Sequence, residues 1–103
     1  MAALFIDIDG TLFDFGTNEP IPGSIALIQS LRKCGHVIIY VTQASENEER
    51  TKAIRKFFDQ GVILYGVQNP RVVVNDMGAA AVNRVTNASW TKSDVNDLLR
   101  MSQ

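Results

Sequence analysis

The sequence is poor in cysteine: Cys34 is its single thiol, beside one histidine and one tryptophan among 103 residues. A lone cysteine cannot form an internal disulfide bond, and we expect Cys34 to be a small, partly buried side chain. An excess of one charge is also lacking, because ten Lys and Arg stand against eleven Asp and Glu. Without a basic field, neither nucleic acid nor an anionic membrane surface is expected as a partner. Any anionic ligand must therefore be held by local groups or by a metal ion.

Long hydrophobic runs are lacking as well. No apolar stretch reaches the roughly 20 residues that cross a bilayer, and no signal peptide precedes the first apolar segment. We therefore expect a cytoplasmic, reducing location and no membrane partner. Hydrophobic residues still make up 46% of the chain, which excludes disorder as its overall state. With no repeat and no linker, the prediction is one domain over residues 1–103.

Apolar runs alternate with amphipathic stretches, and Gly and Pro separate them. This alternation predicts an α/β fold with a mostly parallel sheet of about five strands. The expected strands are, in order, about Ala3–Ile8, Val37–Val41, Val62–Tyr65, Arg71–Asn75 and Val82–Val85. The expected helices run from about Pro22 to Gly35, from a capping box at Ser45-Glu46-Asn47-Glu48 to Gly61, and from Thr91 or Ser93 to Met101.

Two carboxylates interrupt the apolar opening of the chain, which reads Leu-Phe-Ile-Asp-Ile-Asp-Gly-Thr over residues 4–11. Desolvating an unpartnered carboxylate is costly, so Asp7 and Asp9 need a cation or a dense set of hydrogen bonds. The two acids lie two residues apart and project from the same side of an extended chain. Gly10 then permits a turn, and Thr11 adds a hydroxyl. The pattern indicates a metal site with a nucleophile at the end of a strand.

Two later strands of the expected sheet also end in a polar residue. Thr42 follows the second strand, and Asp76 follows the fourth. In open parallel sheets, ligands bind in the crevice beyond the carboxyl ends of the strands. Three such ends in one chain favour a single site over three unrelated solvated turns.

These residues carry a resemblance to a known family. Asp7-Ile8-Asp9-Gly10-Thr11-Leu12 resembles the first motif of the haloacid dehalogenase-like phosphohydrolases. Thr42 after an apolar strand resembles their second motif, and Val72–Asp76 resembles their fourth. The resemblance covers nearly the whole chain, and residues 70–78 are similar to small members without a cap domain. It implies a capless, three-layer Rossmann-like fold.

The resemblance also implies a reaction, the hydrolysis of a phosphomonoester through an aspartyl-phosphate. Asp7 would be the nucleophile, which suits a carboxylate because it is ionised at neutral pH. Asp9 would be the general acid for the leaving oxygen and then the base for the attacking water.

The implied cofactor is Mg²⁺, a hard ion that binds through one or two carboxylates and keeps several waters. Asp7 and Asp76 would supply side-chain oxygens, and Asp9 would face the metal with its backbone carbonyl. Thr42 would hydrogen-bond a phosphoryl oxygen, helped by backbone N–H groups after Asp9 and after Thr42. The expected phosphate-binding residues are Thr42, Gly10, Thr11 and Gln43.

Two departures from the family pattern stand out. The family usually has a lysine that stabilises the phosphoryl group; Lys56 is the better candidate by its distance upstream of Asp76, with Lys52 next and Arg71 as a further cation. The last motif also has a single acid, because Asn75 precedes Asp76 and alanines follow. These departures leave open a binding or regulatory module with little catalysis, or a phosphotransferase.

The segments between the motifs are too short to hold a cap domain. About ten residues separate Thr11 from the first expected helix, and residues 42–76 hold one helix and a short strand. An uncovered site must accept a large or exposed phosphomonoester, or take a roof from another subunit. Because small capless relatives often oligomerise, the resemblance implies a homo-oligomer.

Overall fold

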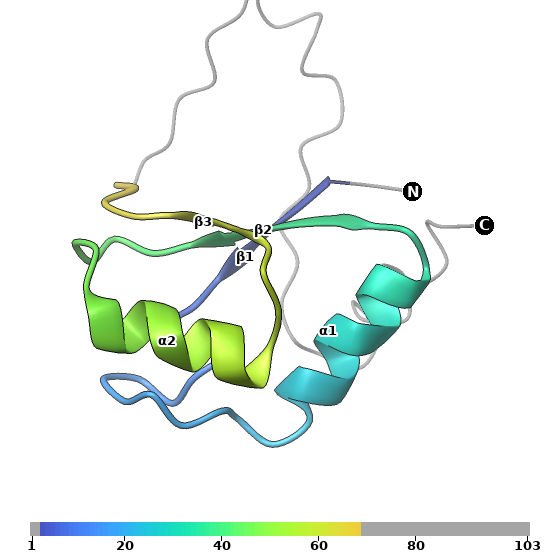
Figure 1. The fold of residues 1–103 in the computed structure, drawn as a ribbon, viewed down its shortest axis with the longest axis horizontal. Coiled ribbons are helices and arrows are strands. Elements are labelled where there is room, and N and C mark those ends of the chain that lie inside the picture. The colour runs from blue at the N-terminus through green and yellow to red at the C-terminus, as the bar shows by residue number, and fades with distance from the viewer. Residues whose placement is uncertain (1–2, 69–103) are drawn as a thin grey trace, which may run out of the picture.

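Strands and helices alternate along the chain, as the sequence predicts. The structure is a computed structural model, and it describes residues 3–68. The elements in that part are β1 (Ala3–Asp7), α1 (Ser24–Lys33), β2 (Val37–Val41), α2 (Glu48–Phe57) and β3 (Val62–Leu64) (Figure 1). The three strands form one parallel sheet in the order β1-β2-β3. The α/β prediction is confirmed for this part, while the expected strands Arg71–Asn75 and Val82–Val85 and the last expected helix lie outside the described residues.

The register of the sheet brings the three carboxyl ends to one edge. Asp7 pairs with Val41, and Val41 pairs with Leu64. Because each strand is followed by a turn or helix at this edge, the segments after β1 and β2 begin side by side. This edge of the sheet is the one that binds ligands in open parallel folds.

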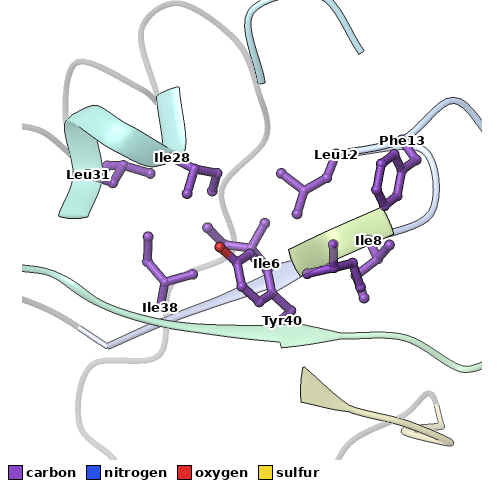
Figure 2. Close-up of a cluster of buried hydrophobic side chains, with 9 residues drawn as sticks. Ile6, Ile8, Leu12, Phe13, Ile28, Leu31, Ile38 and Tyr40 are labelled. Atoms are coloured by element: carbon purple, nitrogen blue, oxygen red, sulfur yellow. The ribbon is translucent and has the colours of Figure 1, made fainter. Parts of the chain in front are cut away.

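Both helices pack on the same face of the sheet, below the strands in Figure 1. Alternate strand residues point to this face, including Ile6, Ile38 and Tyr40, and all three are buried. Each fully buried Ile contributes on the order of 1.5–3 kcal/mol of stability. The buried side chains labelled in Figure 2 are Ile6, Ile8, Leu12, Phe13, Ile28, Leu31, Ile38 and Tyr40.

Apolar side chains also lie on the opposite face of the sheet. Phe5 is 60% exposed and Val62 59%, and Val37 and Leu64 are exposed as well. Successive strand residues alternate between faces, so these side chains lie across the sheet from the helices. Within residues 3–68 this second face carries exposed apolar side chains, although Val41, which pairs with Leu64 on it, is buried.

Helix α2 begins later than the sequence predicts. The expected capping box started the helix at Ser45, but the helix begins at Glu48, and its N-cap is Asn47. The Asn47 side chain accepts a hydrogen bond from the Arg50 backbone N–H at 2.7 Å. Asparagine and serine are equally good N-cap residues, and both lie in this segment. The local pattern therefore did not distinguish Ser45 from Asn47, and the predicted start at Ser45 is wrong.

Gly61 has a different role from the helix-ending one that the sequence suggests. Helix α2 already ends at Phe57, with Phe58 as its C-cap. A Cβ atom at Gly61 would lie 2.9 Å from Asp59 Oδ1 and would also meet the Arg32 guanidinium. The residue is glycine because the backbone passes directly beside a polar cluster.

This polar cluster joins α1, β2 and the turn before β3. Arg32 Nε donates to Asp59 Oδ2 at 2.9 Å, and the Tyr40 hydroxyl donates to Asp59 Oδ1, also at 2.9 Å. The Gly61 N–H donates to the same Oδ1 at 2.9 Å. Burial by itself raises the pKa of Asp59, but the bonds from Arg32, Gly61 and Tyr40 outweigh it, so that the pKa lies below its ordinary value.

Because its pKa is lowered, Asp59 is expected to stabilise the folded protein at neutral pH and to lose this contribution in acid. Because Asp59 binds its proton less readily in the folded state, its contribution is complete above the unfolded pKa, about 3.9, and is lost as the pH falls through the folded value. We expect Asp59→Asn to lower the free energy of unfolding by ~2 kcal/mol at pH 7 and by less at pH 3. Urea unfolding at both pH values measures this, with the exposed Asp14→Asn as the control. An equal loss at the two pH values would contradict the prediction.

His36 follows the C-terminus of α1 and is buried, whereas a histidine just after a helix-ending glycine suggests a residue at the surface. The residue is 3% exposed. Gly35, with φ 87°, turns the chain back after α1, and the His36 N–H donates to Leu31 O at 3.2 Å. His36 lies two residues before Ile38, so its side chain points to the same face of the sheet as Ile38 and Tyr40. The helices cover that face, and His36 is therefore buried. Cys34 is partly buried, as expected.

Candidate functional site

The chain turns sharply where β1 ends, at the carboxyl edge of the sheet. The strand ends at Asp7, and the N–H groups of Leu12 and Phe13 both donate to Ile8 O, at 3.0 and 3.1 Å. Asp9 therefore lies in a turn and not in an extended strand. Asp7 and Asp9 would project from the same side only in an extended chain, and the turn at Ile8 and Asp9 breaks that alternation.

The Asp9 carboxylate contacts the segment that follows the neighbouring strand. Thr42 directly follows β2, and its hydroxyl donates to Asp9 Oδ2 at 2.8 Å. The same hydroxyl oxygen accepts from the Ala44 N–H at 3.2 Å, which orients it. The structure thus brings together the acid that follows β1 and the threonine that follows β2.

The other oxygen of Asp9 forms an ion pair with Arg50, in the first turn of α2. Arg50 is 8% exposed, and its guanidinium lies 5.1 Å from the centroid of the Phe13 ring. Burial lowers the pKa of Arg50, and the charge of nearby Tyr65 works in the opposite direction. A buried, positively charged side chain therefore lies at the carboxyl edge beside Asp9.

Sequence reasoning missed Arg50, although one signal was available. A helix dipole favours acids in the first turn, where Glu48 and Glu49 lie, and disfavours cations there. An arginine in this first turn is therefore unfavourable unless another interaction offsets the dipole, such as an ion pair with a carboxylate in the tertiary structure.

The lysines expected to bind phosphate lie elsewhere. Lys52 pairs with Glu48 on the exposed side of α2, with Nζ and Oε1 3.1 Å apart. Lys56 lies in the last turn of α2, and its ammonium is 5.1 Å from the centroid of the Phe57 ring. At a rise of about 1.5 Å per residue it lies ~9 Å along the helix from Arg50. Arg50, and not Lys56, is therefore the helix cation that the structure places at Asp9; Arg71 lies outside the described residues.

The backbone donors expected for phosphate are used inside the turn. The Gly10 N–H donates to Phe13 O at 2.9 Å, and the Thr11 N–H donates to Ile8 O at 3.4 Å. Gly10 has φ 77°, a conformation that its lack of a side chain permits. Gln43 follows Thr42 and is exposed. Phosphate could reach the Gly10 and Thr11 N–H groups only if this turn rearranged.

A cavity of about 540 Å³ opens beside Arg50. It lies between the loop after β1 and the beginning of α2. Its volume is in the range of small-molecule sites. The residues that line it are Gly16, Thr17, Asn18, Ala44, Asn47, Glu48, Glu49 and Arg50.

The described part of this edge offers one exposed carboxylate of the kind that Mg²⁺ binds. Asp7 ends β1 with an exposed carboxylate, the hard oxygen donor that Mg²⁺ prefers. Both side-chain oxygens of Asp9 are engaged, so Asp9 would reach the metal through its backbone carbonyl. Within residues 3–68, no group of three or more His, Cys, Asp or Glu side chains is placed to hold a metal ion, and Asp76 lies outside them. A Mg²⁺ ion that keeps most of its waters needs only one or two carboxylates.

No protein-family model, curated protein or solved structure matched the chain. Neither α1 nor α2, the helices of the described part, is long and apolar enough to span a membrane. The functional conclusion therefore depends on the residues at the carboxyl edge.

Proposed function

We propose that this chain is a Mg²⁺-dependent phosphatase that hydrolyses a phosphomonoester through an aspartyl-phosphate on Asp7. The observation that supports it best is the meeting of Asp9, Thr42 and Arg50 at the carboxyl edge of the sheet, next to the end of β1. An acid, a hydroxyl and a buried cation side by side suit a reaction in which a proton moves and an anionic group is held.

In the proposed reaction, a carboxylate oxygen of Asp7 attacks phosphorus, and the bond from phosphorus to the leaving oxygen breaks. Asp9 enters this step protonated on Oδ2, with the Thr42 contact open and the Arg50 contact kept, and gives that proton to the leaving oxygen. Water then attacks the phosphorus, Asp9 takes a proton from the water, and the bond to Asp7 breaks to release inorganic phosphate. In this scheme the Thr42 hydroxyl, which has a single proton, would donate to a phosphoryl oxygen instead of to Asp9 Oδ2. Asp7, the backbone carbonyl of Asp9 and Asp76 would hold Mg²⁺, which would offset the repulsion between carboxylate and phosphate.

A binding or regulatory module is the second candidate, and one observation favours it. Both oxygens of Asp9 are engaged, by Arg50 and by Thr42. Proton transfer from Asp9 requires one of these contacts to open, whereas a non-catalytic domain could keep both. A phosphotransferase would use the same first step and pass the phosphoryl group to an acceptor other than water.

We also propose that the part of the chain after residue 68 completes a three-layer, capless fold. The exposed apolar side chains on the second face of the sheet, among them Phe5, Val37 and Val62, support this proposal. The expected helix ending at Met101 has Val95, Leu98 and Leu99 on one side and could cover that face. A homo-oligomer could supply a roof over the carboxyl edge, and the cytoplasm remains the proposed location.

The test is a phosphatase panel run with Mg²⁺ and with EDTA at high protein concentration. We expect phosphate release from at least one phosphomonoester that EDTA abolishes and added Mg²⁺ restores, because a carboxylate does not attack a phosphate dianion efficiently without charge neutralisation. Absence of Mg²⁺-dependent turnover across the panel would contradict the phosphatase and favour the binding module. A product in which phosphate is transferred to an added alcohol would identify a phosphotransferase.

A further inference from the structure

Arg50 lies at a position that is unfavourable for an arginine, both in the helix and in the protein interior. It lies in the first turn of α2, at the end where the helix dipole disfavours a cation, and it is buried. Burying a guanidinium is costly unless charged and polar partners compensate. The partners of Arg50 therefore indicate the role of this residue.

The partners of Arg50 come from two other segments. Nη2 pairs with Asp9 Oδ1 after β1. Nη1 donates to the Thr17 carbonyl and, at 2.8 Å, to Asn18 Oδ1. A guanidinium is planar, with five N–H groups in a rigid fork, so its position is set by all of these partners together.

Thr17 and Asn18 belong to a loop, residues 14–20, that is closed by its own hydrogen bonds. The Asp14 N–H donates to Glu19 O and the Thr17 N–H to Asp14 O, both at 2.9 Å. The loop lies over the turn after β1, since the Phe15 ring is 3.6 Å from where a Cβ atom of Gly10 would be. Arg50 therefore ties a preformed loop to α2, beside the 540 Å³ cavity that both segments line.

We propose that Arg50 is a positioning residue that holds Asp9 and loop 14–20 in one arrangement, so that the group handling the proton and the loop selecting the substrate are placed by one guanidinium. The inference rests on the proposed phosphatase. Arg50 acts through Asp9 on the chemical step and through Thr17 and Asn18 on the walls of the cavity. Thr17, Asn18 and Asn47 are polar residues that line that cavity, and Glu48 and Glu49 add negative charge to it. The leaving group that fits is polar and carries hydroxyl or amino groups.

Two variants separate the two contacts. Asn18→Ala removes one bond to the loop and leaves the Asp9–Arg50 pair in place, so we expect KM to rise about threefold or more with kcat within about twofold of the parent. Arg50→Lys keeps the charge, but an ammonium cannot span Asp9 and the loop together. For Arg50→Lys we expect kcat to fall on the order of 10- to 100-fold, the effect of a small misplacement of a reacting group. Lys52→Met, which removes an exposed cation from the same helix, is the matched control.

Hydrogen–deuterium exchange on the full chain gives a second measurement that does not depend on turnover. We expect backbone exchange of residues 14–19 to be faster in Arg50→Lys and in Asn18→Ala, and unchanged in Lys52→Met. Unchanged exchange in Arg50→Lys, or equal kcat and KM changes in Arg50→Lys and Lys52→Met, would overturn the proposal. If no form of the protein releases phosphate, the proposed function fails, and the exchange result still decides whether Arg50 positions the loop.

Discussion

Replacement of Asp7 by asparagine is expected to lower Mg²⁺-dependent phosphate release on the order of 10³-fold or more. The amide that replaces the carboxylate is a poor nucleophile and a weak Mg²⁺ ligand, and losses of this size follow the removal of a nucleophile. Asp7 is the last residue of β1 and is exposed, so the change should alter the free energy of unfolding by less than about 0.5 kcal/mol. Loss of turnover with little loss of stability is the combined result that identifies a nucleophile.

The measurement compares initial rates of phosphate release for the parent, Asp7→Asn and Asp14→Asn. Asp14 is an exposed loop acid near the same edge, so its variant controls for the loss of one negative charge. A beryllofluoride adduct on Asp7 of the parent, absent from Asp7→Asn, would add direct support. Turnover that survives Asp7→Asn would remove Asp7 from the reaction and leave the aspartyl-phosphate proposal without its central residue.

Asp9→Asn is expected to lower both activity and stability. An amide cannot exchange the proton that the leaving oxygen needs, and loss of a general acid and base typically costs about 10²- to 10⁴-fold in kcat. The same change leaves Arg50 buried beside a neutral amide, and losing the partner of a buried charge is destabilising. Since Asp9 itself is partly exposed, we expect a loss of about 2 kcal/mol in the free energy of unfolding.

Steady-state kinetics and urea unfolding of the same preparations measure the two effects. Thr42→Ser is the matched control, because it keeps the hydroxyl that donates to Asp9 Oδ2. We expect that variant to keep most of the kcat of the parent. If Asp9→Asn retained both kcat and stability, the ion pair and the proton transfer assigned to Asp9 would both be wrong.

Much of the fold follows from short-range pattern. The continuous β-branched run of β2 and the 3.6-residue spacing of Ile28 and Leu31 in α1 are local features, and the structure has both elements where the sequence predicts them. The ends of elements depend on competition between neighbouring residues. Ser45 and Asn47 are both good N-caps, and only the packing of the rest of α2 decides between them.

The residues of the candidate site that directly follow strands could be predicted from the sequence. Asp9 and Thr42 follow adjacent strands, and parallel pairing brings such ends to one edge. The cation was not predictable by the same reasoning, because it depends on how α2 packs against the loop after β1. Counting residues upstream of Asp76 favoured Lys56, whereas the helix turn that faces Asp9 carries Arg50.

By itself, the sequence determined the alternation of strands and helices and the placing of Asp7, Asp9 and Thr42 at strand ends, since these are matters of period and order along the chain. The tertiary structure alone decided that His36 is buried, that Gly61 passes beside Asp59, and that Arg50 joins Asp9 to loop 14–20. Each of these depends on residues that meet from different segments. Contacts between segments that are far apart in the sequence leave no periodic pattern in it. They are therefore determined only by how the helices pack on the sheet.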